Sequence, residues 1–300
     1  CRYLFKKIEF LGAEKKFGNP GYEAGFIMKG VPSVLWVVAL KAEAKPIIDE
    51  LELIPVKMQT NFPVYHNKKE SNWLIVSGVG KNQATAATNY LREISNAASW
   101  SAWINVGIAG YGHDSYGALY MIDKVTLETS NIVLYPGVTL LTSLPRAGLL
   151  TVNKPKLDYS GQDLIDMEGF SFYDTASKFT CRELLAILKV VSDGPKSDVR
   201  ALSSERIFKL ISNNIKEILT LGSKLENSSK SEFKRITPPN ICDQIKKTWH
   251  FTVSQEHQLN MLVRRWLAVF PESTLLSTIK NQKNSKSVIT ILSRKLGKYE

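Results

Sequence analysis

Long apolar runs and cysteines are scarce in this sequence of 300 residues. No apolar run reaches the roughly 18 residues that a membrane-spanning helix needs, and the longest, 31–40, contains Pro32 and is typical of a buried strand. The three cysteines, Cys1, Cys181 and Cys242, lie too far apart in the sequence to form a zinc or disulfide pattern. We therefore expect no membrane association and no metal site. The absence of a secretory signal pattern favours a reducing, cytoplasmic location.

Acidic residues are scarce only in the last third of the chain. Residues 1–199 hold 21 Lys and Arg against 20 Asp and Glu, whereas residues 200–300 hold 18 against 8, so nearly all of the net charge of +11 lies there. This asymmetry predicts two parts. We expect a leader of unknown role at 1–33, a globular domain at 34–199 and a basic helical extension at 200–300.

Strand-like and helix-like segments alternate between residues 34 and 195. Apolar runs at 34–40, 73–77 and 102–106 predict strands that are buried on both faces. Helices are expected at 41–53, 82–94 and 170–179. Repeated strands with helices between them predict an α/β fold with a mostly parallel sheet.

The predicted strand ends carry carboxylates and glycine turns. Glu43 follows the first strand, Glu168 opens a helix, and Asp193 ends the last strand after Ser192. Because the carboxyl ends of parallel strands share one edge of a sheet, these groups can converge. Each has a purely structural explanation: Glu43 and Glu168 as acids of a first helical turn, Asp193 as a turn former. Their joint placement favours a functional site.

Six segments, in family order, resemble motifs of the nucleoside phosphorylase/nucleosidase superfamily, and most closely those of 5′-methylthioadenosine/S-adenosylhomocysteine nucleosidases. They are Val38-Ala-Leu-Lys-Ala-Glu43, Ser77-Gly-Val-Gly-Lys81, Asn105-Val-Gly-Ile-Ala-Gly110, Gly117-Ala-Leu-Tyr-Met-Ile-Asp-Lys-Val125, Asp166-Met-Glu-Gly169 and Val190-Val-Ser-Asp193. The resemblance spans about 34–195. It implies a phosphorylase-like three-layer α/β sandwich around a mixed, mostly parallel sheet, to which the helical extension is added. It also implies a homodimer, and cleavage of the N-glycosidic bond of an adenosine-type purine nucleoside without a cofactor.

The resemblance implies a role for each site residue. Asp193, held by Ser192, would act as general acid toward N7 of the purine. Glu168 would accept hydrogen bonds from the ribose hydroxyls, Met167 would pack on the sugar, and Glu43 would orient or deprotonate the attacking water. The remaining substrate-binding residues would be Ile108, Ala109 and Gly110.

Arginine is also scarce before residue 200, and this bears on the attacking group. A phosphorylase binds a phosphate dianion with arginines and glycine-loop amides, but none of Arg2, Arg92, Arg146 and Arg182 lies at a predicted strand end. Hydrolysis is therefore preferred. The nucleosidases usually have Ser at the position of Ile108 and Arg at that of Lys189. A phosphate-dependent phosphorylase, and a catalytically degenerate nucleoside-binding or nucleic-acid-associated protein, stay open as alternatives.

The last hundred residues are predicted to be helical and polar. An apolar stripe predicts a helix at 203–221, Ser and Lys predict a linker at 225–235, and Pro271 is expected to end an amphipathic helix that follows Thr252. Two short helices are expected at 273–279 and 287–296. A helical module at 240–297 would contact nucleic acid through Arg264, Arg265, Lys280, Lys283, Lys286, Arg294 and Lys295. The alternative is an accessory or oligomerisation module with a solvated basic surface.

Overall fold

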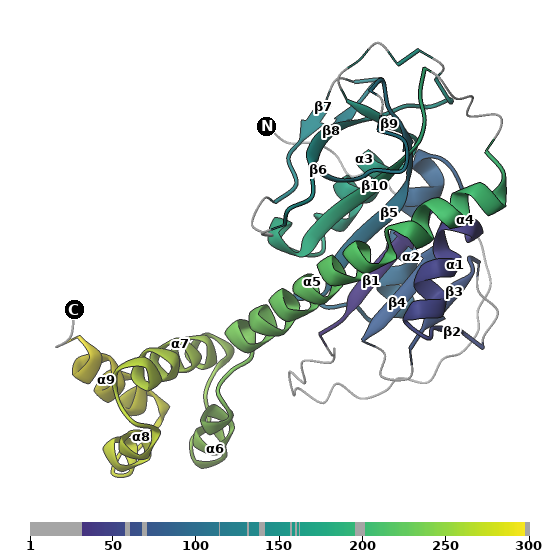
Figure 1. Ribbon diagram of the computed structural model, residues 1–300. Coiled ribbons are helices and arrows are strands. Elements are labelled where there is room, and N and C mark those ends of the chain that lie inside the picture. The colour runs from purple at the N-terminus through teal and green to yellow at the C-terminus, as the bar shows by residue number, and fades with distance from the viewer. Residues whose placement is uncertain are drawn as a thin grey trace, which may run out of the picture.

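The computed structural model describes residues 32–57, 61–67, 71–113, 115–130, 132–137, 142–156, 158–159, 161, 163–195 and 202–297. The predicted leader lies outside these ranges, apart from its last two residues. An α/β part and a group of small helices follow one another along the chain, and the long helix α5 leads from one to the other (Figure 1). No helix in the described ranges is long and apolar enough to cross a membrane.

A mixed sheet of ten strands organises the α/β part. Five of its strands, β5, β10, β6, β8 and β9, close into a barrel, because β9 pairs back onto β5. Strands β1, β4, β3 and β2 continue the sheet outward from β5, and β7 pairs with β6. The strands are β1 (Val34–Val38), β2 (Ile54–Pro55), β3 (Val64–His66), β4 (Asn72–Val76), β5 (Ala102–Gly110), β6 (Leu119–Leu127), β7 (Ile132–Leu134), β8 (Arg146–Thr151), β9 (Leu164–Asp166) and β10 (Leu185–Asp193).

The expected α/β fold with a mixed sheet is confirmed, but the sheet is evenly mixed rather than mostly parallel. Among the described strands, five pairings are parallel and five are antiparallel. The alternation of strands and helices predicts only the parallel crossovers. Short connections between β2, β3 and β4, and between β6 and β7, join neighbouring strands without a helix and therefore make them antiparallel.

Helices cover both faces of the sheet. One apolar core joins alternate residues of β1 to α1 (Lys41–Glu50). The other joins the opposite face to α2 (Lys81–Ile94) and α3 (Gly169–Ala176). Strand β1 is buried along its whole length because its two faces contribute to two different cores, as its continuous apolar sequence predicts.

Two helices from the basic extension complete the first core. Helices α4 (Ser204–Asn213) and α5 (Ile215–Ile236) bury Leu210, Ile211 and Leu221 against the sheet. Gly222 lies so close to the sheet that a Cβ there would stand 2.6 Å from Cη2 of Trp36. The expected boundary at residue 199 therefore falls before helices that pack on the α/β part.

The predicted linker at 225–235 is wrong, because α5 continues through it to Ile236. Leu225 and Ser229 are fully buried, and the ring centroid of Phe233 lies 5.3 Å from that of Trp100. Ion pairs between residues one turn apart, such as Lys230 with Glu226, support the solvent-facing side of the helix. The polar composition thus belongs to an exposed helix face.

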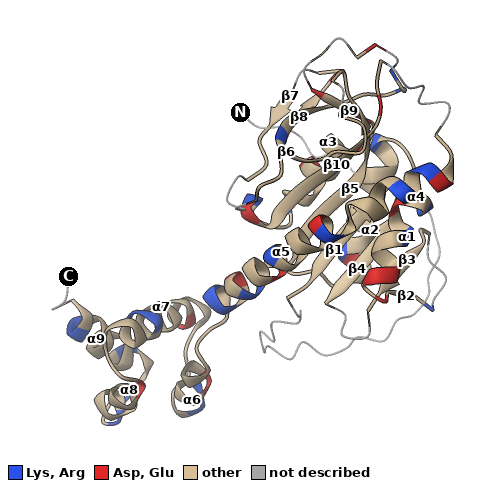
Figure 2. Ribbon diagram, in the orientation of Figure 1, with Lys and Arg blue, Asp and Glu red and all other residues tan. Residues whose placement is uncertain are grey.

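The remaining helices form a module with its own apolar core, here called the α6–α9 module. They are α6 (Asn240–Thr248), α7 (Val253–Val269), α8 (Glu272–Ile279) and α9 (Ser285–Leu296). The last three confirm the predicted helices, and Thr252 and Gln255 form a capping box at the start of α7. Its Lys and Arg are distributed over the helices (Figure 2), and none of those described is buried. Nucleic-acid contact through them stays a prediction.

Candidate active site

A pocket opens at the carboxyl ends of the central parallel strands. Strands β1, β4, β5 and β10 run in the same direction, so their ends share one edge of the sheet. The structure brings all eight predicted site residues to the lining of this pocket: Glu43, Ile108, Ala109, Gly110, Met167, Glu168, Ser192 and Asp193. The strand ends therefore converge on one pocket, as expected.

Glu43 reaches the pocket from the first turn of α1 and is 2% exposed. Its Oε1 accepts a hydrogen bond from the amide of Ile108 at 2.9 Å, and its Oε2 accepts one from the amide of Leu40 at 2.8 Å. Burial raises the pKa of Glu43, and these amides and Lys189 offset part of the effect. Although the side chain of Ile108 cannot donate a hydrogen bond, its backbone holds the Glu43 carboxylate.

Asp193 ends β10 with both carboxylate oxygens accepting hydrogen bonds from hydroxyl groups. Ser192 donates to Oδ1 and Tyr159 donates to Oδ2, each at 2.5 Å. The Asp193 carbonyl accepts from the amide of Tyr111 at 2.9 Å, which fixes the strand end against β5. The carboxyl group is therefore held from two sides at the pocket wall.

Glu168 immediately precedes α3 and is also buried. Its Oε1 accepts a hydrogen bond of 2.6 Å from the amide of Gly80, the residue that immediately precedes α2 and has a φ of 105°. Burial and repulsion from Asp166 raise the pKa of Glu168 to about 7, although Lys189 and the Gly80 amide act in the opposite direction. This carboxyl group therefore changes its charge near neutral pH.

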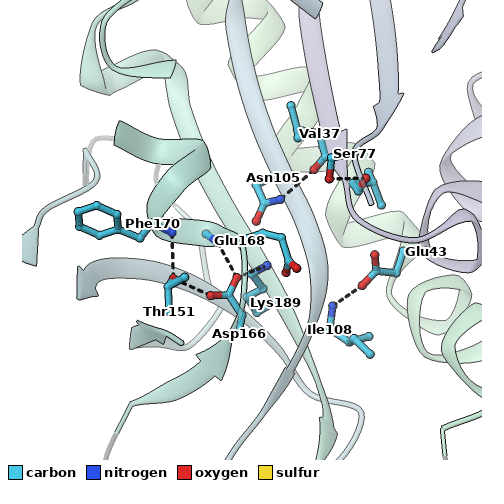
Figure 3. A network of polar contacts seen from close by, with 12 residues as sticks. Val37, Glu43, Ser77, Asn105, Ile108, Thr151, Asp166, Glu168, Phe170 and Lys189 are labelled. Atoms are coloured by element: carbon cyan, nitrogen blue, oxygen red, sulfur yellow. Dashed lines mark hydrogen bonds and ion pairs between the residues drawn. The ribbon is translucent and has the colours of Figure 1, made fainter. Parts of the chain in front are cut away.

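A buried ion pair lies behind the pocket wall. Nζ of Lys189 on β10 lies 2.8 Å from Oδ2 of Asp166, and both side chains are 1% exposed. Asp166 also accepts hydrogen bonds from the hydroxyl of Thr151 and from the amide of Gly169, each at 2.7 Å. Figure 3 shows Glu168 beside this network, and Glu43 with its hydrogen bond to the amide of Ile108.

The charges of this network are mutually dependent. Burial disfavours the charged form of Lys189, but Asp166 and Glu168 outweigh that effect and raise its pKa. Asp166 also has a structural role, because its carboxylate accepts a hydrogen bond from the first amide of α3. Asp166 thus both binds the amino-terminal end of α3 and compensates the buried charge of Lys189.

Two glycines of β5 make room for these side chains. A Cβ at Gly107 would lie 3.1 Å from Nζ of Lys189 and 3.2 Å from Oε1 of Glu43. A Cβ at Gly110 would lie 2.7 Å from Oδ2 of Asp193 and 2.6 Å from Cε1 of Tyr159. The glycines of the 105–110 motif therefore allow the site residues to approach the strand closely.

Several other lining residues are not marked by any pattern in the sequence. Tyr159 lies in the segment between β8 and β9, where no periodicity or motif marks it, and Val152, Pro155 and Lys156 come from the same segment. Lys156 is the only Lys or Arg among the described lining residues, and it forms an ion pair with Glu128. The lining thus combines apolar side chains with an excess of carboxylates.

Neither protein-family models nor curated proteins match the chain. Solved structures do match. A 5′-methylthioadenosine/S-adenosylhomocysteine nucleosidase from Campylobacter jejuni matches with a TM-score of 0.52 and 16% identity, over 65% of this chain and 100% of that one. The corresponding nucleosidase from Helicobacter pylori gives 0.53 and 12%, over 64% and 98%. A futalosine hydrolase mutant from Helicobacter pylori gives 0.51 and 11%, over 65% and 100%.

The chain shares its fold with these hydrolases. At such low identity the likeness extends to the fold and not to the substrate, because one fold can carry many activities. Any assignment of activity therefore depends on the pocket residues themselves.

Proposed function

We propose that the protein hydrolyses the N-glycosidic bond of a purine nucleoside. The observation that carries this proposal is the presence of three differently held carboxyl groups, Glu43, Glu168 and Asp193, around one pocket. Glycosidic bond cleavage needs one group to assist departure of the leaving group and another to activate water. The shared fold of nucleosidases supports the same class of reaction.

Asp193 is assigned the role of general acid. A purine leaves poorly as an anion, so a proton must reach a ring nitrogen as the bond from C1′ to nitrogen breaks. The bond electrons go to the base, the acid proton goes to N7, and Asp193 becomes a carboxylate. The hydroxyls of Ser192 and Tyr159 then hydrogen-bond to the new charge.

Glu168 and Glu43 are assigned to the sugar and the water. The ribosyl group gains positive charge in the transition state, and the hydrogen bonds between its hydroxyls and the Glu168 carboxylate strengthen with that charge. Met167 is the apolar surface for the ribose. Water adds to C1′ and gives its proton to Glu43, whose raised pKa favours uptake of that proton. Proton exchange with solvent restores both groups.

The charge of the pocket favours water over phosphate as the attacking group. Four carboxyl groups, of Glu43, Asp166, Glu168 and Asp193, belong to the lining. Lys156, the sole lining cation among the described residues, already has Glu128 as its partner. A phosphate dianion requires arginines or several amide donors, and repulsion from the carboxylates would weaken its binding.

Incubation of the full chain with methylthioadenosine, adenosine and inosine, with and without phosphate, tests this proposal. We expect free base and free ribosyl product in phosphate-free buffer, at a rate that phosphate does not raise. Strict dependence on phosphate would replace hydrolysis by phosphorolysis. Absence of any turnover, together with a higher melting temperature in the presence of a nucleoside, would identify a binding protein instead.

A further inference from the structure

Among the described residues, Tyr159 is the one whose side-chain hydroxyl hydrogen-bonds to the Asp193 carboxyl group from outside β10. It lies between β8 and β9, 34 residues before Asp193, and its hydroxyl donates a 2.5 Å hydrogen bond to Oδ2. The side chain is 8% exposed and lines the same pocket. Ser192, which binds Oδ1, is fixed by being the adjacent residue, whereas Tyr159 is placed by long-range packing.

The backbone of the neighbouring strand is shaped around this tyrosine. A Cβ at Gly110 would lie 2.6 Å from Cε1 of Tyr159, and a Cβ at Gly112 would lie 2.1 Å from its carbonyl oxygen. Side chains at these two positions would displace the tyrosine ring or its backbone. Gly110 therefore makes room for the ring of Tyr159 beside Asp193, and Gly112 makes room for its main chain.

We propose that Tyr159 is a positioning residue for the general acid, which orients the Asp193 carboxyl group and hydrogen-bonds to the carboxylate that forms when the proton leaves. This inference rests on the proposed glycosidic hydrolysis. Each carboxyl oxygen has two lone-pair sites. Tyr159 uses one site of Oδ2, and the other site carries the proton toward the ring nitrogen of the base.

The proton transfer explains why this contact acts mainly in the transition state. A general acid donates its proton from the neutral form, so at the start of this step Tyr159 donates to a neutral carboxyl oxygen. As the proton moves to the base, negative charge develops on Asp193, and a hydrogen bond to a charged acceptor is about twice as strong as one to a neutral acceptor. An interaction that strengthens only as the bond breaks raises kcat without lowering KM.

Tyr159→Phe in the full chain isolates the hydroxyl, because it removes a single oxygen and keeps the ring between the two glycines. We expect kcat on a purine nucleoside to fall by about 10–100-fold, from the loss of one hydrogen bond to a charged group. We expect KM to change by less than about threefold. Tyr173→Phe is the matched control, since Tyr173 is also buried and its hydroxyl donates a hydrogen bond to the carbonyl of Tyr135 instead.

Two further measurements separate positioning from a merely structural role. Nitrophenyl riboside releases a leaving group that needs no protonation, so Tyr159→Phe should leave its hydrolysis within about twofold of the wild-type rate. In an Asp193→Asn background the tyrosine change should likewise have no additional effect on nucleoside cleavage, because the group that it serves is absent.

Unchanged kcat in Tyr159→Phe overturns the inference, as does a loss confined to KM. An equal loss on the two substrates, or a loss that persists in the Asp193→Asn background, identifies a structural tyrosine and also overturns it. The proposed hydrolysis survives all of these outcomes. It fails only if the wild-type chain cleaves no nucleoside without phosphate, a result that is visible before any variant is made.

Discussion

The α/β part and the α6–α9 module differ in how they place the side chains of Asp, Glu, Lys and Arg. The described residues of the α/β part bury five of these side chains, namely Glu43, Asp166, Glu168, Lys189 and Asp193, and all five lie at or directly behind the pocket. The described residues of the α6–α9 module bury no Asp, Glu, Lys or Arg. Its core consists of apolar side chains and Cys242, and its charged side chains are exposed or half-buried.

This difference distinguishes residues that stabilise the fold from residues that are placed for chemistry in the pocket. Burial of a charge opposes folding unless partners compensate for it, and an apolar core of similar volume is often more stable. The α6–α9 module uses the simpler solution throughout. The buried charged side chains are concentrated at one edge of the sheet, and this indicates a chemical role for that edge. Each of these side chains has an identifiable partner.

The largest expected effect is on catalysis. Asp193→Asn removes the transferable proton and keeps the shape of the side chain, so we expect the rate of nucleoside cleavage to fall by about 10²–10⁴-fold. The melting temperature should stay close to that of the wild type. Steady-state release of free base measures the first quantity and thermal unfolding the second. Glu272→Gln, an exposed carboxylate of the α6–α9 module, is the control, and Asp193→Asn activity within tenfold of wild type would contradict the acid role.

The next largest effect is on stability. Lys189→Met keeps the length of the side chain but leaves Asp166 and Glu168 buried without their cation. Removal of one partner from a buried pair costs about 3–5 kcal/mol of unfolding free energy. Lys283→Met, at an exposed position of the α6–α9 module, should change it by less than about 0.5 kcal/mol. Urea denaturation measures the unfolding free energy of both variants. Similar small losses in the two variants would show that burial of charge does not distinguish the two parts.

A pH-dependent effect is expected at Glu168. In the folded chain the pKa of this carboxyl group is raised from 4.5 to about 7. Below pH 4.5 the folded and unfolded states are both protonated at this position, and the wild type is at its most stable with respect to this group. As pH rises toward 7 only the unfolded state loses the proton, so the wild type loses up to about 3 kcal/mol.

Glu168→Gln removes that titration. The stability of the variant relative to wild type should therefore increase between pH 4.5 and 7 and then level off. Denaturation midpoints of both proteins across this range measure the difference. If the difference does not depend on pH, the carboxyl group is not held in the environment described above.

The sequence made the convergence of Glu43, Glu168 and Asp193 predictable for a physical reason. Each is local to a strand end, and the parallel pairing of β1, β5 and β10 brings such ends to one edge. The proximity of Lys189 to Gly107 depends instead on the register between β10 and β5, where the two residues lie opposite each other. The register depends on both strands together and cannot be predicted from either segment alone.

Tyr159 illustrates the same limit more strongly. Its place depends on the closure of the barrel, in which β9 joins β5 through the pairing of Ile165 with Gly110. The predicted linker at 225–235 was wrong for a related reason. The polar residues of α5 suggest a linker, but Leu225 and Phe233 pack against residues that lie far away in the sequence. Those contacts cannot be read from the composition of the segment.

The smallest expected effect comes from removal of the α6–α9 module. Every described lining residue of the pocket lies between Ala39 and Asp193, and α5 packs on the α/β part as far as Phe233. A chain that ends at residue 237 should therefore cleave nucleosides within about threefold of the full-length rate, as a change remote from the site does. A chain that ends at residue 214 loses Leu221 and Leu225 from the first core and should not fold. If instead the shorter deletion at 237 abolished activity, the module would have to act on the pocket from outside it, and the separation of roles between the two parts would be overturned.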